Sequence, residues 1–309
     1  MDGTVKNNMI SVAAPAKLNL YLHVTGKRHD GYHLIDSLAA FAAEHDIIRV
    51  ELASDLRLTN TGPFGHDLAT DDDNLVMRAA RRLRDMTGLS VGAHIHLFKR
   101  LPIASGIGGG SADAAATIKA LVRLWELHPG EHDLSGLALG LGADVPVCLY
   151  GRAAFMGGIG EVLEPVGRLP EMPLVLVNPG IDVPTPSVFR ARRGEFSFPA
   201  PFQQEPQTGR DLIAALTDGR GNDLMAPAIA LAPAIGDVLA HLDAAQGCQF
   251  SRMSGSGATC FGFFETTAAA TRAAARIGAD RPDWWVVATR LLYDVCTLAP
   301  QQPTWMKDG

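Results

Sequence analysis

Residues 101–116 read LPIASGIGGGSADAAA, in which four glycines fill five positions and an alanine-rich run follows at once. Glycine has no side chain and tolerates positive φ, so the backbone of this loop can wrap closely around a ligand. The run from Ser111 to Leu127 predicts a long helix, whose free N–H groups and positive end face the same space. This arrangement is typical of an anion site, above all for phosphate, with Ser111 as a helix cap or as a ligand of phosphate or metal.

Two familiar phosphate-binding patterns do not fit this loop. No Gly-Lys-Ser/Thr follows the glycines, so the loop is not a Walker A motif. Counted from Gly106, the last glycine of the dinucleotide pattern G-x-G-x-x-G is replaced by Ser111, which argues against a dinucleotide oxidoreductase. The plain alternative is a glycine-rich turn without a ligand.

The rest of the chain mixes strand and helix signals, which predicts an α+β protein. Its 309 residues, 47% of them apolar, are enough for a large core in two domains, with a boundary near residue 160. Strands are expected over 10–24 (interrupted at 15–17), 47–52, 92–97, 174–177, 261–264 and 286–289. Helices are expected over 75–83, 111–127, 134–141, 211–216, 234–245 and 267–277.

Charge and cysteine content narrow the functional classes. The formal charge is −6, from 27 basic and 33 acidic residues, so nothing draws the whole chain to nucleic acid or to an anionic membrane. The four cysteines form no C-x-x-C pair and lie among apolar neighbours, which predicts buried free thiols in a reducing cytosol. Residues 1–8 lack the apolar run of a signal peptide, and no run reaches the ~20 apolar residues of a membrane helix. A cytoplasmic protein is expected.

Three further segments carry candidate chemistry. Lys17 lies in an apolar run, where it is either a compact point charge or an edge-strand lysine that reaches solvent. Asp144 is flanked by apolar residues and needs a partner if it is buried; Lys17 is one such partner, and helix capping or turn formation is the alternative. The small-residue run at 253–261 is either a ligand-facing turn or a tight connection between a helix and a strand.

Two polar clusters are more simply explained as solvent-exposed groups than as metal sites. His94 and His96 share one face of the expected strand, but no third metal ligand lies nearby in sequence, so solvent-facing histidines are expected. Residues 71–73 are three aspartates before a helix, where a solvated acidic turn is expected rather than a cation site.

The glycine loop, Lys17 and Asp144 occur in an order that typifies one superfamily. The carrying stretches span most of the chain: residues 15–20 (PAKLNL), 25–33 (TGKRHDGYH), 102–116, 142–146 (GADVP), 184–186 (PTP) with Phe189, and 253–257 (MSGSG). In these stretches the chain resembles the GHMP kinases, the superfamily of galactokinase, homoserine kinase, mevalonate kinase and phosphomevalonate kinase. The elements at 30–33 and 184–186 narrow the resemblance to members that act on a cytidine-linked sugar alcohol of the non-mevalonate isoprenoid pathway.

This resemblance implies a fold and an activity. The fold is a two-domain α+β architecture, with the active cleft between an ATP-binding domain over 1–160 and a substrate domain over 161–309. The first domain would resemble a ribosomal protein domain, and the second would be ferredoxin-like. The enzyme would move the γ-phosphate of ATP, with Mg²⁺ present, onto the C2 hydroxyl of a methylerythritol unit joined to cytidine by a diphosphate. The choice between monomer and homodimer stays open.

The resemblance also implies roles for individual residues. Asp144 matches the catalytic base, and Lys17 matches the lysine that pairs with it. Residues beside ATP are implied to be Asn74, Lys99, Pro102, Ser105, Gly106, Gly108, Gly109, Gly110 and Ser111. Residues beside the acceptor are implied to be Asn19, Tyr32, His33, Thr185 and Phe189. The Mg²⁺ ligands are open, with Ser111 ahead of Asp113, and Ala39 stands where some relatives carry a second aromatic residue near the substrate.

Two alternatives remain at this level. The shared loop also permits a kinase that acts on another acceptor, such as homoserine or mevalonate. A non-catalytic nucleotide-binding or RNA-binding module is the other, although the acidic balance and the lack of a basic cluster argue against RNA.

Overall fold

The computed structural model describes residues 9–128 and 131–298 and has the expected mixed α+β content. Its strands are β1 (Ile10–Lys27), β2 (His33–Ala53), β3 (Leu56–Thr61), β4 (Gly92–Phe98), β5 (Ala154–Gly157), β6 (Val162–Pro165), β7 (Pro173–Asn178), β8 (Cys248–Met253), β9 (Cys260–Phe264) and β10 (Trp285–Leu292). Its helices are α1 (Leu75–Thr87), α2 (Gly109–Leu124), α3 (Glu131–Leu141), α4 (Val145–Tyr150), α5 (Thr185–Ala191), α6 (Gly209–Thr217), α7 (Met225–Leu231), α8 (Ala234–Asp243) and α9 (Thr267–Asp280), and a short 3-10 turn follows at Val295–Thr297.

All twelve segments predicted from the sequence are confirmed in type. The interruption expected at residues 15–17 is a bulge, because the pairing of β1 with β2 shifts register between Pro15 and Lys17 and then continues. The short elements β3, β5, β6, β8, α4, α5 and α7 were not predicted. Each spans four to seven residues, which is too short for a hydrophobic period to stand out.

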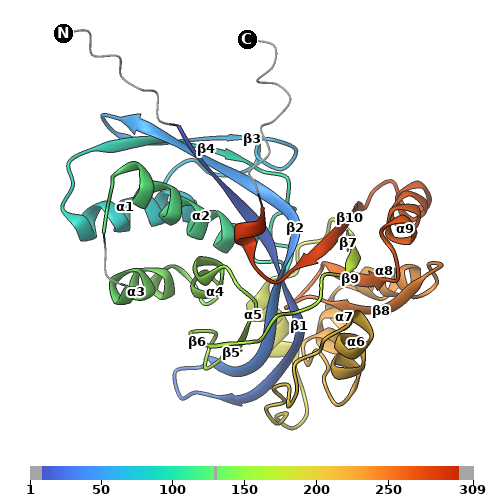
Figure 1. Cartoon of the computed structure of the whole chain (residues 1–309). Helices are drawn as coiled ribbons and strands as arrows, with labels where there is room; N and C mark the ends of the chain where they lie inside the picture. The colour runs from blue at the N-terminus through green and yellow to red at the C-terminus, as the bar shows by residue number, and fades with distance from the viewer. Residues whose placement is uncertain (1–8, 129–130, 299–309) are drawn as a thin grey trace.

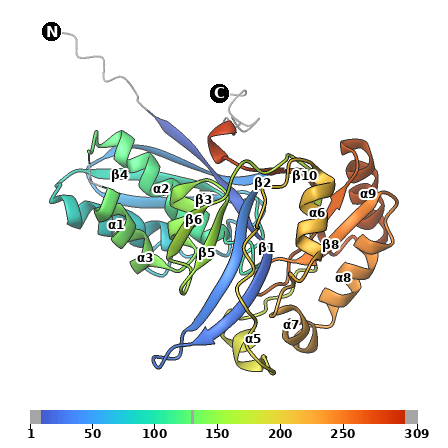
Figure 2. The ribbon, with the colours of Figure 1, turned by 60° about the horizontal axis from the view of Figure 1, so that its bottom comes forward.

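The long antiparallel pair β1–β2 runs through both halves of the molecule (Figure 1). The later part of β2 pairs with β4, its earlier part pairs with β5, and β10 reaches it at Phe41 and Ala42. Turning the molecule shows the pair between the helices of the N-terminal half and those of the C-terminal half (Figure 2). The β1–β2 hairpin therefore connects the two halves and helps to set their relative position.

In the N-terminal half, β1, β2, β4 and β3 lie side by side and α1 and α2 pack on one face of this sheet. The alanine-rich start of α2 is buried there, including Ala112 and Ala114–Ala116. Side chains this small let the helix backbone approach the sheet closely. Close packing fixes the position of the N-terminus of α2, which follows directly on the glycine loop.

In the C-terminal half, β10, β7, β9 and β8 form an antiparallel sheet that is covered on both faces. Leu174 and Leu176 of β7 face α6 and the β1–β2 pair, whereas Val175 and Val177 face α8 and α9. A strand covered on both sides needs apolar residues at every position, which is why residues 174–177 form a continuous apolar run.

The boundary expected near residue 160 falls between β5 and β6, which pair with each other. The division into 1–160 and 161–309 stays a prediction. The four cysteines are free, as expected, although only Cys148 and Cys260 are fully buried. Among the described residues, no helix combines the length and the apolar character needed to cross a membrane.

Arg252 of β8 should contribute strongly to stability. Its guanidinium is buried and donates to the carbonyl oxygens of Leu20 at 2.8 Å, Leu216 at 3.1 Å and Arg220 at 2.8 Å. Arg252→Met leaves these carbonyls without a donor and should lower the free energy of unfolding by about 3 kcal/mol, as measured by urea denaturation. The control Arg276→Met removes an exposed pair with Asp280 and should cost under about 1 kcal/mol. Equal losses in the two variants would contradict this role.

Candidate active site

A cavity of about 1090 Å³ opens between the glycine loop, the end of the β1–β2 hairpin and α5. All the residues that the sequence assigns to the site except Asn74 line it: Lys17, Asn19, Tyr32, His33, Lys99, Pro102, Ser105, Gly106, Gly108, Gly109, Gly110, Ser111, Asp144, Thr185 and Phe189. Residues that lie up to 172 positions apart in the chain are thus brought to one cleft.

Two glycines of the loop have a positive φ, a conformation that is strained for residues with a side chain. Gly106 has φ +73°, and a Cβ there would lie 2.4 Å from the carbonyl oxygen of Gly257. Gly108 has φ +62° and is the N-cap of α2, with no side chain to cap the helix. The first N–H groups of α2 are therefore left for a ligand, and Gly109, Gly110 and Ser111 line the cavity.

Lys17 and Asp144 form an ion pair beside this helix end. The distance from Lys17 Nζ to Asp144 Oδ2 is 3.0 Å, and the same ammonium donates to Asn19 Oδ1 at 2.6 Å. Lys17 is 2% exposed, so the solvent-reaching alternative for this lysine is wrong. Asp144 occupies the N-cap position of α4 but makes no capping hydrogen bond, and its side chain is 36% exposed toward the cleft.

Within the small-residue run at 253–261, Gly255 and Ser256 line the cleft. The hydroxyl of Ser254 accepts from the backbone N–H of Asn19 at 3.1 Å and donates to the carbonyl of Gly106 at 3.2 Å. Ser256 lines the cavity and exchanges a 2.7 Å hydrogen bond with Thr185 of α5. This turn therefore joins the C-terminal half to the glycine loop and to β1.

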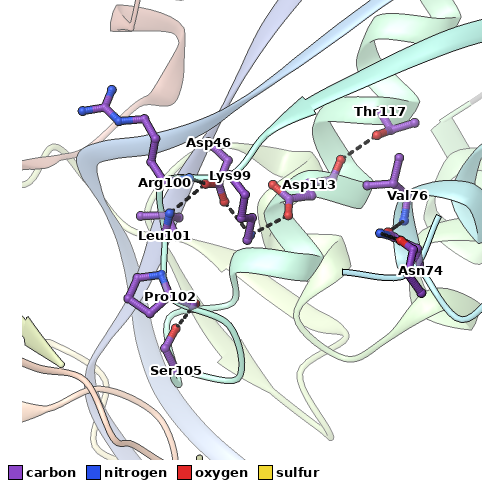
Figure 3. A network of polar contacts seen from close by, with 11 residues as sticks. Asp46, Asn74, Val76, Lys99, Arg100, Leu101, Pro102, Ser105, Asp113 and Thr117 are labelled. Atoms are coloured by element: carbon purple, nitrogen blue, oxygen red, sulfur yellow. Dashed lines mark hydrogen bonds and ion pairs between the residues drawn. The ribbon is translucent and has the colours of Figure 1, made fainter. Parts of the chain in front are cut away.

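A buried charge cluster lies beneath the glycine loop (Figure 3). Lys99 Nζ donates to Asp46 Oδ2 and to Asp113 Oδ2, both at 2.6 Å. Asp46 also accepts from the backbone N–H groups of Arg100 at 2.5 Å and Leu101 at 2.8 Å. The cluster therefore holds the chain at the point where β4 turns into the loop.

The charges of this cluster depend on one another. Burial alone lowers the pKa of Lys99, but Asp113 and Asp46 outweigh it and raise the pKa overall, so the ammonium stays charged. Burial raises the pKa of Asp113 well above 3.8 and the nearby Asp46 adds to that rise, while Lys99 opposes it. Removal of the lysine would leave two carboxyl groups facing each other away from water.

Three residues implied to bind ATP or metal, Asn74, Lys99 and Asp113, already form hydrogen bonds or ion pairs with other parts of the protein. The amide of Asn74 caps α1 through Val76 N–H at 2.9 Å and donates to the Ala69 carbonyl at 2.7 Å. Lys99 touches the cavity with its ammonium already bound to two carboxylates. Contacts of Asn74 and Lys99 with adenine stay predictions. Asp113 does not line the cavity, whereas Ser111 does, and a contact of Ser111 with a metal stays a prediction.

The far end of the cleft is aromatic. The rings of His33 and Phe189 stack with centroids 4.9 Å apart, and Tyr32 beside them is 59% exposed. Burial, followed by the charges of Lys27 and Arg192, lowers the pKa of His33, which favours its neutral form. A neutral imidazole offers one hydrogen-bond donor and one acceptor to a ligand.

Sequence reasoning missed several basic residues of the cleft, namely Lys27, Arg190, Arg192 and Arg193. The run FRARR at 189–193 was the available signal, because three arginines directly follow an assigned aromatic residue. Ala39 is fully buried in the core and does not line the cavity.

Comparison with known proteins places the chain in a family. Residues 74–152 match the family pattern described as GHMP kinases N terminal domain, and residues 207–282 match GHMP kinases C terminal. A relative in Paramagnetospirillum magneticum named 4-diphosphocytidyl-2-C-methyl-D-erythritol kinase is 51% identical over 91% of this chain and 98% of its own length. The chain belongs to this family of GHMP kinases.

Solved structures give the same family fold. A crystal structure of 4-(cytidine 5'-diphospho)-2C-methyl-D-erythritol kinase, 38% identical, covers 91% of this chain and 99% of its own, with a TM-score of 0.75. A homoserine kinase from Cytophaga hutchinsonii covers 94% and 96% with a TM-score of 0.72, but at 18% identity it shows the fold alone. The GHMP kinase architecture expected from the sequence is confirmed, and the chain is a phosphotransferase rather than a non-catalytic binding module.

The cluster beneath the loop of this GHMP kinase makes a sharp prediction. Lys99→Met leaves Asp46 and Asp113 buried without their cation and should lower the free energy of unfolding by about 3–5 kcal/mol in urea denaturation. The control Lys119→Met removes a lysine of α2 whose ammonium donates to one carbonyl, that of Cys148 at 3.0 Å, and should cost about 1 kcal/mol. A Lys99 variant as stable as the control would refute the proposed charge cluster.

Proposed function

We propose that this kinase transfers the γ-phosphate of ATP to the C2 hydroxyl of 4-diphosphocytidyl-2-C-methyl-D-erythritol, in the non-mevalonate route to isoprenoid precursors. The observation that carries the proposal is the Lys17–Asp144 pair, 3.0 Å apart, in the same cleft as the uncapped N-terminus of α2. The relatives named for this activity, about half identical over nine-tenths of the chain, support the choice of acceptor.

ATP is proposed to place its phosphates on the glycine loop. Backbone N–H groups at Gly109, Gly110 and Ser111 and the positive end of α2 suit a polyanion. Mg²⁺ commonly reaches such sites with the nucleotide and keeps several waters, so it needs few protein ligands. The Ser111 hydroxyl is the side chain proposed to meet it, and the ion would neutralise charge on the phosphates.

Asp144 is proposed to act as the base that accepts the proton of the attacking hydroxyl. Its carboxylate is open to the cleft, whereas Lys17 is buried behind it and stabilises its negative charge. Asn19 holds the ammonium from the other side, and its own Nδ2 is fixed by Ser37 Oγ at 2.8 Å. Phosphoryl transfer depends on positioning and charge stabilisation of this kind more than on covalent help from the protein.

The cytidine end of the acceptor is proposed to bind at the aromatic end of the cleft. Phe189 and Tyr32 offer ring faces for cytosine, and the neutral His33 and Thr185 offer hydrogen-bonding groups. The basic residues at 190–193 line the same end and suit an acceptor that carries a diphosphate. Homoserine and mevalonate have no aromatic ring to stack on these side chains.

The protein is proposed to work in the cytoplasm, as a monomer or a homodimer. Free cysteines throughout the chain fit a reducing compartment.

Replacement of the proposed base should abolish most turnover. Asp144→Asn should lower kcat for ADP formation by about 10²-fold or more with ATP, Mg²⁺ and the cytidine-linked acceptor, because the amide cannot accept the proton. Asp237→Asn, an equal charge change on α8 outside the cavity, should leave kcat unchanged. Near-normal turnover by the Asp144 variant would remove this residue from the proposed role.

Loss of the stacking ring should affect the acceptor alone. Phe189→Ala should raise KM for the cytidine-linked acceptor about tenfold, since a base stacked on an aromatic side chain gains about 1–3 kcal/mol. The KM for ATP should not change. Phe198→Ala, at a ring 88% exposed and outside this cavity, is the control. An unchanged acceptor KM in Phe189→Ala would favour a kinase with a different acceptor.

A further inference from the structure

A compact group of metal-ligating side chains lies on the outer face of the N-terminal sheet, apart from the cleft. Glu51 of β2 lies directly opposite His94 of β4, and His96 is two residues further along the same strand. Residues two apart on a strand point to one face, so the three side chains meet above it. None of them lines the active-site cavity.

This placement adds a third group that the sequence did not indicate. The two histidines were expected to face solvent because no third ligand lies nearby in sequence. The third ligand comes from the neighbouring strand, 43 positions before His94. The side chain of His94 is only 14% exposed, and those of Glu51 and His96 are about one-third exposed.

Hydrogen bonding does not fully account for the spacing of the three groups. Nδ1 of His94 lies 3.2 Å from Glu51 Oε1 and 3.1 Å from His96 Nε2, and the last two atoms are 3.9 Å apart. A ring nitrogen carries one N–H or one lone pair, so Nδ1 can satisfy only one of its two close neighbours in full. A single cation between the three atoms would satisfy all of them.

The geometry points to a metal. We propose that Glu51, His94 and His96 bind one divalent transition-metal ion of the Zn²⁺ class. Ligand atoms about 2.1 Å from a tetrahedral zinc ion lie about 3.4 Å from one another, and the observed separations of 3.1, 3.2 and 3.9 Å bracket that value. Water would complete the coordination on the exposed side.

A supporting contact fixes the ring of His94. Its other nitrogen, Nε2, lies 2.9 Å from the hydroxyl of Thr59 on β3. A metal-ligating histidine commonly uses its second nitrogen in this way, because the hydrogen bond sets the tautomer and the orientation of the ring. Thr59 is therefore a positioning residue of the proposed site.

The donor set and its surroundings select the kind of ion. Two imidazoles and one carboxylate suit Zn²⁺, Ni²⁺ or Co²⁺, whereas Mg²⁺ prefers oxygen ligands. Arg49 and Arg57 lie beside His96 and His94 on the same face, and their positive charges further disfavour an ion held mainly by electrostatic attraction. The ion would join β2 to β4 without taking part in phosphate transfer, so this proposal does not rest on the proposed function.

Zinc uptake by the full chain, purified without metal and kept free of nucleotide, tests the site. Isothermal titration with ZnCl₂ should give one site per chain, and both His94→Gln and His96→Gln should weaken it at least tenfold. Thr59→Val keeps all three ligands and should weaken it by a smaller factor. His66→Gln removes an exposed histidine outside the cluster and should bind zinc like the parent. MgCl₂ should not compete.

Several results would overturn the proposal. Equal zinc uptake by the parent and by the two ligand variants would show that the cluster holds no metal. Loss of binding in His66→Gln as large as in the ligand variants would assign uptake to scattered surface histidines. All four variants should keep ATP turnover, since none of the substituted residues lines the cleft, and this turnover confirms that they are folded.

Discussion

The cleft depends on close packing of the glycine-loop backbone against β1 and the turn at 254–257, which is possible because Gly106 and Gly108 have no side chains. At Gly106 a side chain would collide with the backbone of the 254–257 turn, and at Gly108 it would press on Lys17, whose Cε lies 3.1 Å from the position of a Cβ. The backbone N–H of Lys17 in turn donates to the carbonyl of Ile107 at 2.8 Å. The loop, β1 and the C-terminal turn therefore hold one another in place, and the end of α2 cannot shift without disturbing the Lys17–Asp144 pair.

Two supports maintain this arrangement from outside the cleft. The β1–β2 hairpin carries Lys17 and Asn19 on one strand and Asp46 on the other, and it belongs to the cores of both halves. The Lys99 cluster ties Asp46 to α2 through Asp113, directly under the first turn of that helix. Burial of ionisable groups is costly unless they pair with one another, so the contacts of Lys99 with Asp46 and Asp113 favour a single position for the loop.

Much of the site could be predicted from local sequence, and the rest depended on contacts across the fold. The glycine run and the helix after it have local signatures, and Lys17 and Asp144 stand out as charges among apolar residues. Asp46 carries no such signal, because its partner lies 53 residues away and only strand pairing brings them together. The same holds for Glu51 beside His94. Ser254 meets Asn19 across 235 positions through packing of the turn after β8 against β1. The sequence alone did not indicate the pairing register of the strands or this packing.

The central claim is that the end of α2 and Asp144 act on the two reactants of one transfer. A crystal structure of the protein with a non-hydrolysable ATP analogue and the cytidine-linked acceptor tests it most directly. The γ-phosphate should lie on the N–H groups at Gly109–Ser111, and the C2 hydroxyl should lie about 2.6–3.2 Å from an oxygen of Asp144. A triphosphate bound away from the glycine loop, or a hydroxyl remote from Asp144 while both ligands are fully bound, would contradict it.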